Sequence, residues 1–174
     1  LDEGTTSARA ILFDGESRIV CMAQHEIRQI YPAPGWVEQD PMEIYANQYA
    51  ALTECIAKSG IDPRDIAAIA IDSATHSSLV CDGDKTPLRH AMHWTDSRSR
   101  GRAQYLLEQH GNEIFKKTHH KPDTIWTLPQ LLWLSEREPE LYSKIGKLFF
   151  EKDYIRYFLT GVFCTDYIEA EGSM

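Results

Sequence analysis

With 174 residues, about 43% of them apolar and 25% charged, the chain has room for one domain with a real core and at most a small appendage. Its net charge of −8 argues against a broad surface for nucleic acid or anionic membranes, and no apolar run approaches the roughly 20 residues of a membrane span. The four cysteines are scattered without a C-x-x-C pair, so we expect neither a zinc site nor a disulfide framework, and we expect a reducing, cytoplasmic location.

The opening of the chain alternates turn signals with stretches typical of β-strands. Residues 9–13 (RAILF) predict a strand, residues 14–17 (DGES) its turn, and residues 18–23 the returning strand. The stretch at residues 25–30 would continue this meander, and two prolines stiffen the loop at residues 31–36. The chain therefore begins with a predicted β-meander that ends in a stiff loop.

A strong helix-start signal follows the loop. Asp40 suits the N-cap, Pro41 suits the first helical position, and Glu43 closes a capping box. Apolar residues then recur at helical spacing until Gly60. This pattern predicts a helix from residue 41 to the glycine.

The remainder of the chain predicts an α/β domain. The run IAAIAI at residues 66–71 has the composition of a buried central strand, and residues 78–81 and 91–94 are two further strand candidates. Helical patterns occupy four later stretches, residues 97–109, 128–137, 140–145 and 152–159. Early strands followed by helices predict a mixed central sheet flanked by helices.

The stretch LDEGTTSAR at residues 1–9 carries the clearest chemical signal. Its candidates for a phosphate site are Asp2, Gly4, Thr5, Thr6, Ser7 and Arg9. A glycine turn with hydroxyl residues lets backbone N–H groups converge on an anion, Arg9 offers a guanidinium fork for phosphate oxygens, and Asp2 offers a hard oxygen ligand for Mg²⁺. An ordinary Gly-Thr hairpin turn, with Thr6 and Ser7 as plain turn hydroxyls, is the alternative that these residues alone leave open.

The same stretch, continued to LDEGTTSARAILFD, resembles the phosphate-binding hairpin that opens sugar and polyol kinases of the FGGY family. Further blocks resemble that family in order along the chain, at residues 31–44, 69–77, 94–98 and 152–161 with 165–167. The resemblance implies an actin/hexokinase-like ATPase fold with a ribonuclease H-like lobe. It also implies ATP-dependent phosphoryl transfer to a hydroxyl of a small sugar or polyol.

The resemblance assigns roles to residues of the first stretch and to parts of the protein beyond this chain. Asp2 would act through Mg²⁺, and the residues near the phosphates of ATP would be Gly4, Thr5, Thr6, Ser7 and Arg9. The family's general base is an aspartate that we expect beyond Met174, and we expect the second, nucleotide-binding lobe outside residues 1–174 as well. This chain is therefore expected to be an incomplete N-terminal kinase lobe, inactive alone, from a protein that could form a homodimer.

Polar side chains follow the strand expected at residues 66–71, and because strand ends are a usual place for ligand contacts in α/β sheets, we expect the sugar pocket there. Glycerol kinases carry an Arg-Glu pair where Thr75 and His76 stand, whereas xylulose kinases carry a histidine at the position of His76. Trp94 matches a pocket aromatic of glycerol kinases, and Trp126 would stack on an apolar sugar face. Simple packing roles for His76, Trp94 and Trp126 are the alternative. We favour a ketose such as xylulose as the substrate, with glycerol or a non-catalytic sugar-binding role as the other hypotheses.

Overall fold

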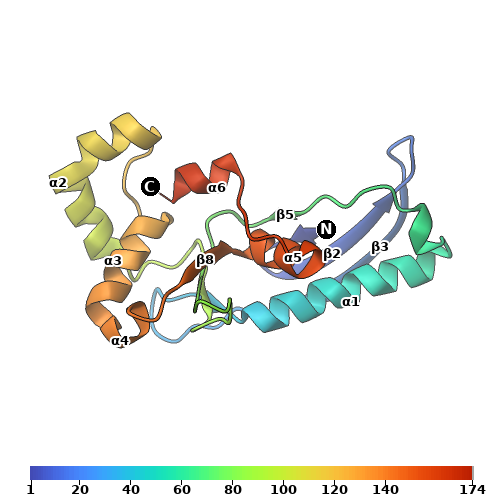
Figure 1. Ribbon diagram of the computed structural model, residues 1–174, viewed down its shortest axis with the longest axis horizontal. Helices are drawn as coiled ribbons and strands as arrows, with labels where there is room; N and C mark the ends of the chain where they lie inside the picture. Colours follow the sequence, from blue (N-terminus) through green and yellow to red (C-terminus); the bar gives the residue numbers. More distant parts are fainter. Residues whose placement is uncertain (174) are drawn as a thin grey trace.

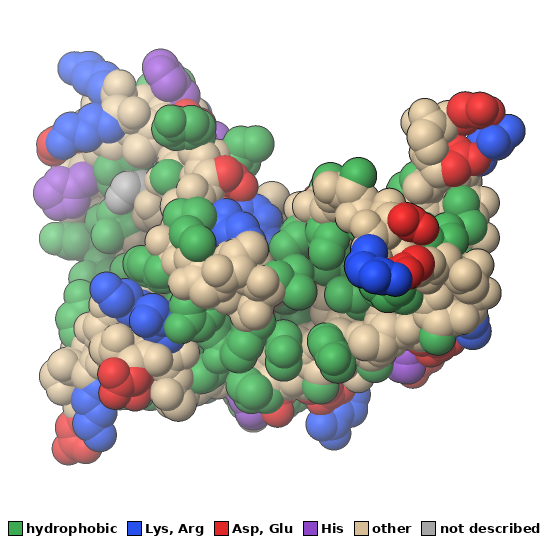
Figure 2. Space-filling view, turned by 45° about the vertical axis from the view of Figure 1, so that its right-hand side comes forward, with side chains coloured by type: hydrophobic (Ala, Val, Ile, Leu, Met, Phe, Trp, Pro, Cys, Tyr) green, Lys and Arg blue, Asp and Glu red, His purple; other side chains and the backbone are tan. Residues whose placement is uncertain are grey.

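The protein folds around two four-stranded sheets, and the computed structural model describes residues 1–173. The first sheet has the order β3-β2-β1-β5. Its strands are β1 (Asp2–Glu3), β2 (Ser7–Phe13), β3 (Ile19–Glu26) and β5 (Asp72–Ser73). β5 runs parallel to β1, whereas β1, β2 and β3 pair antiparallel. The turn of the long β2–β3 hairpin projects from the body and carries charged side chains at its tip (Figure 1, Figure 2).

The second sheet is antiparallel throughout, with the order β4-β7-β6-β8. Its strands are β4 (Glu38–Gln39), β6 (Ser78–Cys81), β7 (Ala91–Met92) and β8 (Lys147–Phe150). The core of this sheet packs buried side chains of β6, β7 and β8 against α5 on one side and α3 on the other. Together the two sheets confirm the predicted mixed α/β architecture, although the strands are divided between two sheets.

Helices cover the two sheets. They are α1 (Pro41–Ser59), α2 (Arg100–Thr118), α3 (Thr127–Arg137), α4 (Pro139–Tyr142), α5 (Glu151–Thr160) and α6 (Tyr167–Gly172), with a 3₁₀ turn, η1 (Pro63–Asp65). In Figure 1, α1 runs along the β2–β3 hairpin, α2, α3 and α4 gather at the other end of the molecule, and α5 and α6 lie between these groups. None of the helices described is long and apolar enough to cross a membrane.

Helix α1 forms as the sequence predicts. Asp40 Oδ1 accepts a hydrogen bond from the N–H of Met42 (2.9 Å), and Gly60 ends the helix in the left-handed region at φ +69°. The buried face of the helix packs Ala51 against small side chains of the β2–β3 hairpin. This packing holds β2, and with it the loop between β1 and β2, against a rigid element.

The expectation of a buried strand at residues 66–71 is wrong. The segment lies at the edge of the first sheet, and Ile69 in it is 52% exposed. Only its end reaches β1: the amino group of Leu1 donates to the carbonyl of Ala70 (2.7 Å), and the N–H of Asp72 donates to the carbonyl of Leu1 (2.8 Å). An apolar strand is buried only where neighbouring strands and covering helices flank it. Here β1 provides a very short partner, so most of the run is open to solvent.

The other predicted elements differ from the observed ones mainly in where they begin and end. The strand expected at residues 91–94 is limited to β7, and the helix expected at residues 97–109 begins at Arg100 and continues to Thr118. The sequence patterns did not predict β4, β8 or α6. Each of these elements is too short to show a clear periodicity.

Candidate active site

The loop between β1 and β2 holds the residues that the sequence singles out for phosphate. The N–H of Gly4 donates to the carbonyl of Ser7 (3.0 Å), which closes the loop into a tight turn. The carbonyl of Thr5 accepts from the side-chain amides of Gln39 (3.0 Å) and Gln29 (3.4 Å). Because these amides fix the Thr5 peptide, the backbone of the loop is held in one shape before any ligand binds.

Asp2 and Arg9 face each other at this loop. Arg9 Nε lies 3.0 Å from Asp2 Oδ2, and about a third of each side chain is exposed (38% and 32%). A Cβ added to Gly4 would lie 3.2 Å from Arg9 Nη2, so the glycine lets the guanidinium lie close to the loop. A partly exposed carboxylate beside a hydroxyl-rich turn is a donor that fits Mg²⁺, which takes one or two carboxylates together with phosphate oxygens and water.

The two hydroxyl residues that follow Thr5 differ in exposure. Thr6 is exposed, and its carbonyl accepts from the N–H of Ile27 (2.9 Å). Ser7 is only 6% exposed and contributes its carbonyl to the turn. Of the two, Thr6 is therefore the one whose side chain is open to a ligand.

The candidate sugar residues His76 and Trp126 are brought together from distant parts of the chain. Their ring centroids are 4.7 Å apart in an edge-to-face arrangement, and Trp126 Nε1 donates to the carbonyl of Lys121 (2.9 Å). His76 has φ +65°, a left-handed conformation that is uncommon for a residue with a side chain and that concentrates at functional sites. Thr75, next to it, is exposed. These three residues form the part of the structure that we call the His76 corner.

Trp94 lies between the His76 corner and the loop at residues 4–6, between β1 and β2, which we call the phosphate loop. Its indole Nε1 donates to Thr5 Oγ1 (3.4 Å), and its backbone N–H donates to Ser77 Oγ (3.3 Å), next to His76. The side chain is 39% exposed. Trp94 therefore does not lie in the core, and it links the two groups of predicted residues.

Three buried glutamates lie behind these groups, and the sequence analysis did not find them. Glu3 and Glu169 have no exposed surface and Glu151 is 2% exposed. Burial is the main cause that raises the pKa of Glu3 and that of Glu151, and the carboxyl of Glu151 raises the pKa of Glu3 further. Both are expected to keep a proton near neutral pH. Glutamate at a strand end or in a first helical turn is usually a surface residue, so no pattern in the sequence marks these three.

Asp96 and Arg98 form a structural network behind Trp94. Arg98 Nη2 lies 2.8 Å from Asp96 Oδ2 and 2.7 Å from Glu38 Oε1, and the Arg98 side chain has no exposed surface. Its guanidinium also lies 4.0 Å from the ring centroid of Trp36. Asp96 accepts from the N–H of Val37 as well. These contacts hold the loop before β4 to the segment that carries Trp94.

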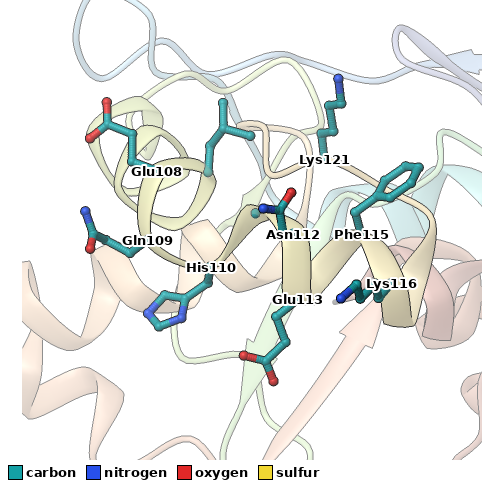
Figure 3. A pocket seen from close by; sticks show the side chains of 10 residues that line it. Glu108, Gln109, His110, Asn112, Glu113, Phe115, Lys116 and Lys121 are labelled. Carbon is teal, nitrogen blue, oxygen red and sulfur yellow. The ribbon is translucent and has the colours of Figure 1, made fainter.

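A separate surface hollow lies along α2 (Figure 3). It is lined by residues 107–113, Phe115, Lys116 and Lys121. In Figure 3 the side chains of Gln109, His110 and Glu113 splay outward from the helix and do not converge on a common point. None of the predicted site residues lines it, so this hollow is separate from the loop between β1 and β2 and from the His76 corner.

The fold is that of the actin/hexokinase-like ATPases, as two solved structures make clear. A xyloylose kinase from Brucella ovis matches with a TM-score of 0.95 and 28% sequence identity, covering 99% of this chain and 35% of that one. A Plasmodium falciparum glycerol kinase, solved with ADP, matches with a TM-score of 0.90 and 27% identity over 99% of this chain and 36% of that one.

Within this class, the whole chain, residues 1–174, matches the FGGY family of carbohydrate kinases, N-terminal domain, and the chain belongs to this family. A glycerol kinase from Thermococcus gammatolerans is 39% identical over 178 residues, which cover 100% of this chain and 36% of that protein. A xylulose kinase from Bacillus subtilis is 29% identical over 174 residues, which cover 100% of this chain and 35% of that protein. The chain thus spans about a third of the length of these relatives.

Proposed function

We propose that the protein transfers the γ-phosphoryl group of Mg-ATP to a hydroxyl of a small sugar or polyol, and that a ketose such as xylulose is its substrate. Family membership supports the reaction, and the position of Trp94 is the observation that carries it. Trp94 contacts Thr5 in the phosphate loop through its indole and Ser77, beside His76, through its backbone. With the phosphate at the loop that holds Thr5 and the sugar at His76, as we propose, the two ends of the site are neighbours, which in-line transfer requires.

Mg-ATP, when bound, supplies the phosphoryl group and part of the charge neutralisation. The hydroxyl oxygen of the sugar forms a bond to the γ-phosphorus while the bond to the leaving ADP oxygen breaks. The carboxylate of Asp2 would hold Mg²⁺, and Arg9 with the N–H groups of the phosphate loop would face the phosphoryl oxygens. We place the general base that accepts the hydroxyl proton outside residues 1–174, together with the second lobe.

The choice of a ketose rests on the His76 corner. Thr75 and His76 offer a hydroxyl and an imidazole to sugar hydroxyls, and Trp126 offers an aromatic face beside the imidazole. Glycerol is the second candidate substrate, because the glycerol kinase from Thermococcus gammatolerans is 39% identical to this chain over the 178 aligned residues. A non-catalytic sugar-binding protein is the third candidate.

An ADP-release assay on the full-length protein tests the reaction and separates these candidates. With Mg-ATP we would compare ketopentoses, pentitols, erythritol and glycerol. Turnover on a ketose with glycerol silent supports the proposal. Turnover on glycerol alone contradicts the interpretation of Thr75 and His76, and sugar binding without turnover on any substrate favours the non-catalytic alternative.

Asp2→Asn tests the role of the phosphate loop. We expect kcat to fall by about 100-fold or more, because a ligand that acts on transition-state charge is removed, while sugar binding measured by calorimetry is retained. Asp14→Asn is the matched control, because Asp14 pairs with Arg18 in the far turn of the hairpin. Equal turnover by wild type and Asp2→Asn would contradict the assignment of Asp2.

A further inference from the structure

The imidazole of His76 lies against a buried carboxylate from the opposite end of the chain. Glu169 on α6 has no exposed surface, and its Oε2 lies 2.9 Å from His76 Nδ1. The same oxygen accepts the backbone N–H of His76 (3.1 Å). Nδ1 has no aligned hydrogen-bond partner among the described residues, so its contact with Glu169 is one of distance and charge. One carboxylate therefore faces both the backbone and the ring of the residue that we place in the sugar site.

The position of Glu169 is itself fixed by neighbouring charges. Asp166 caps α6 by accepting from the N–H groups of Ile168 (2.9 Å) and Glu169 (3.0 Å). Lys152 Nζ on α5 lies 2.6 Å from Asp166 Oδ2 and 3.9 Å from Glu169 Oε1. The lysine thus ties the start of α6 to α5 and partly compensates the buried charge. Glu169 is thus held in place by groups other than the His76 ring.

The ring of His76 is also confined by its packing. A Cβ added to Gly172 would lie 2.1 Å from His76 Cε1, so α6 reaches the ring only because residue 172 has no side chain. On another side the ring meets Trp126 at 4.7 Å between centroids. His76 is therefore enclosed by an indole and by the backbone of α6, with Glu169 at its Nδ1 edge.

We propose that Glu169 is a positioning residue whose charge, next to Nδ1, keeps the proton of neutral His76 on that nitrogen, so that Nε2 presents its lone pair to a sugar hydroxyl. A neutral imidazole donates at one nitrogen and accepts at the other, and a carboxylate beside Nδ1 selects the tautomer with the proton there. The hydroxyl would then donate to Nε2, and its oxygen keeps its own lone pairs for other contacts. This inference deepens the proposed function and rests on it for the identity of the ligand.

NMR of the ring nitrogens tests the tautomer without any substrate. Long-range ¹H–¹⁵N spectra of the histidine-labelled full-length protein, recorded at a pH where the ring is neutral and assigned with His76→Gln, should show the proton on Nδ1. Glu169→Gln should shift the population towards the Nε2–H form, which predominates in free neutral imidazole side chains, whereas Glu169→Asp, which keeps the charge, should retain mostly Nδ1–H. The control is Glu171→Gln, which removes a half-exposed charge from the same helix and should change nothing.

Two results would overturn the inference. The first is a wild-type spectrum that shows the proton on Nε2. This result needs no variant, so it decides the question even if Glu169→Gln is too unstable to study. The second is an unchanged tautomer in a folded Glu169→Gln protein.

Steady-state kinetics provide an independent test of the role of Glu169. In Glu169→Gln the KM for the sugar should rise about 10-fold, with the KM for ATP unchanged, and in Glu171→Gln both should stay at the wild-type values. An unchanged sugar KM in Glu169→Gln, in a protein that phosphorylates sugars, counts against Glu169 alone. Absence of turnover on every sugar counts against the proposed function, while the NMR result still decides the role of Glu169.

Discussion

Glu151 provides a test of how the buried carboxyls affect stability. It lies at the start of α5, 2% exposed, and neither of its oxygens has an aligned hydrogen-bond partner among residues 1–173. Burial raises the pKa of Glu151 from 4.5 to about 8. The folded protein therefore keeps this proton at neutral pH, whereas the unfolded chain releases it. The stabilising effect of the proton is complete below pH 4.5 and is lost as the pH rises towards 8.

The size of the effect follows from the proton linkage. Between the pKa of Glu151 in the unfolded chain and its pKa in the folded protein, each pH unit lowers the free energy of unfolding by about 1.4 kcal/mol. At pH 7 the free energy of unfolding is therefore lower by an amount on the order of 3 kcal/mol. Glutamine has nearly the shape of a protonated glutamate and does not titrate. We therefore expect Glu151→Gln to raise the free energy of unfolding by up to about 3 kcal/mol at pH 7 and to leave it nearly unchanged at pH 4.

Urea unfolding followed by tryptophan fluorescence, repeated from pH 4 to pH 8, measures this difference. Glu171→Gln is the control, because it makes the same exchange at a half-exposed carboxyl. If the free energy of unfolding of Glu151→Gln still changes with pH, the remaining change would report the titration of the neighbouring Glu3. If the profiles of wild type and Glu151→Gln run parallel over the whole range, Glu151 is ionised in the folded protein and the reasoning fails.

Two further substitutions test the packing around the site. Gly172→Ala should lower the free energy of unfolding by about 1–3 kcal/mol, because the new Cβ would lie 2.1 Å from His76 Cε1; a urea titration measures it, and an unchanged midpoint would mean that α6 moves aside freely. Arg98→Met should lower the free energy of unfolding by about 3–5 kcal/mol, because it leaves the buried Asp96 without a guanidinium and leaves Glu38 with Arg89 alone. A loss below about 1 kcal/mol in the same titration would contradict the view that these carboxylates depend on Arg98.

Local signals in the sequence were sufficient for the elements whose structure depends on near neighbours. Helix α1 begins at the cap that Asp40 forms and ends at Gly60, as predicted, because capping and left-handed termination involve residues within one turn. The β2–β3 hairpin and the tight turn at Gly4 follow from turn residues between apolar runs for the same reason. The family membership, too, was already indicated by short motifs in order along the chain.

Tertiary structure decided burial and the partners of polar groups. The run at residues 66–71 has the composition of a central strand, yet it lies at a sheet edge, because burial depends on which strands and helices flank a segment. Glu151 and Glu169 look like ordinary surface residues of short helices, yet both are buried behind the site. The contact of Glu169 with His76 joins residues 93 positions apart. Periodicity and capping report on neighbours along the chain, whereas desolvation and charge pairing depend on groups that only the folded chain brings together.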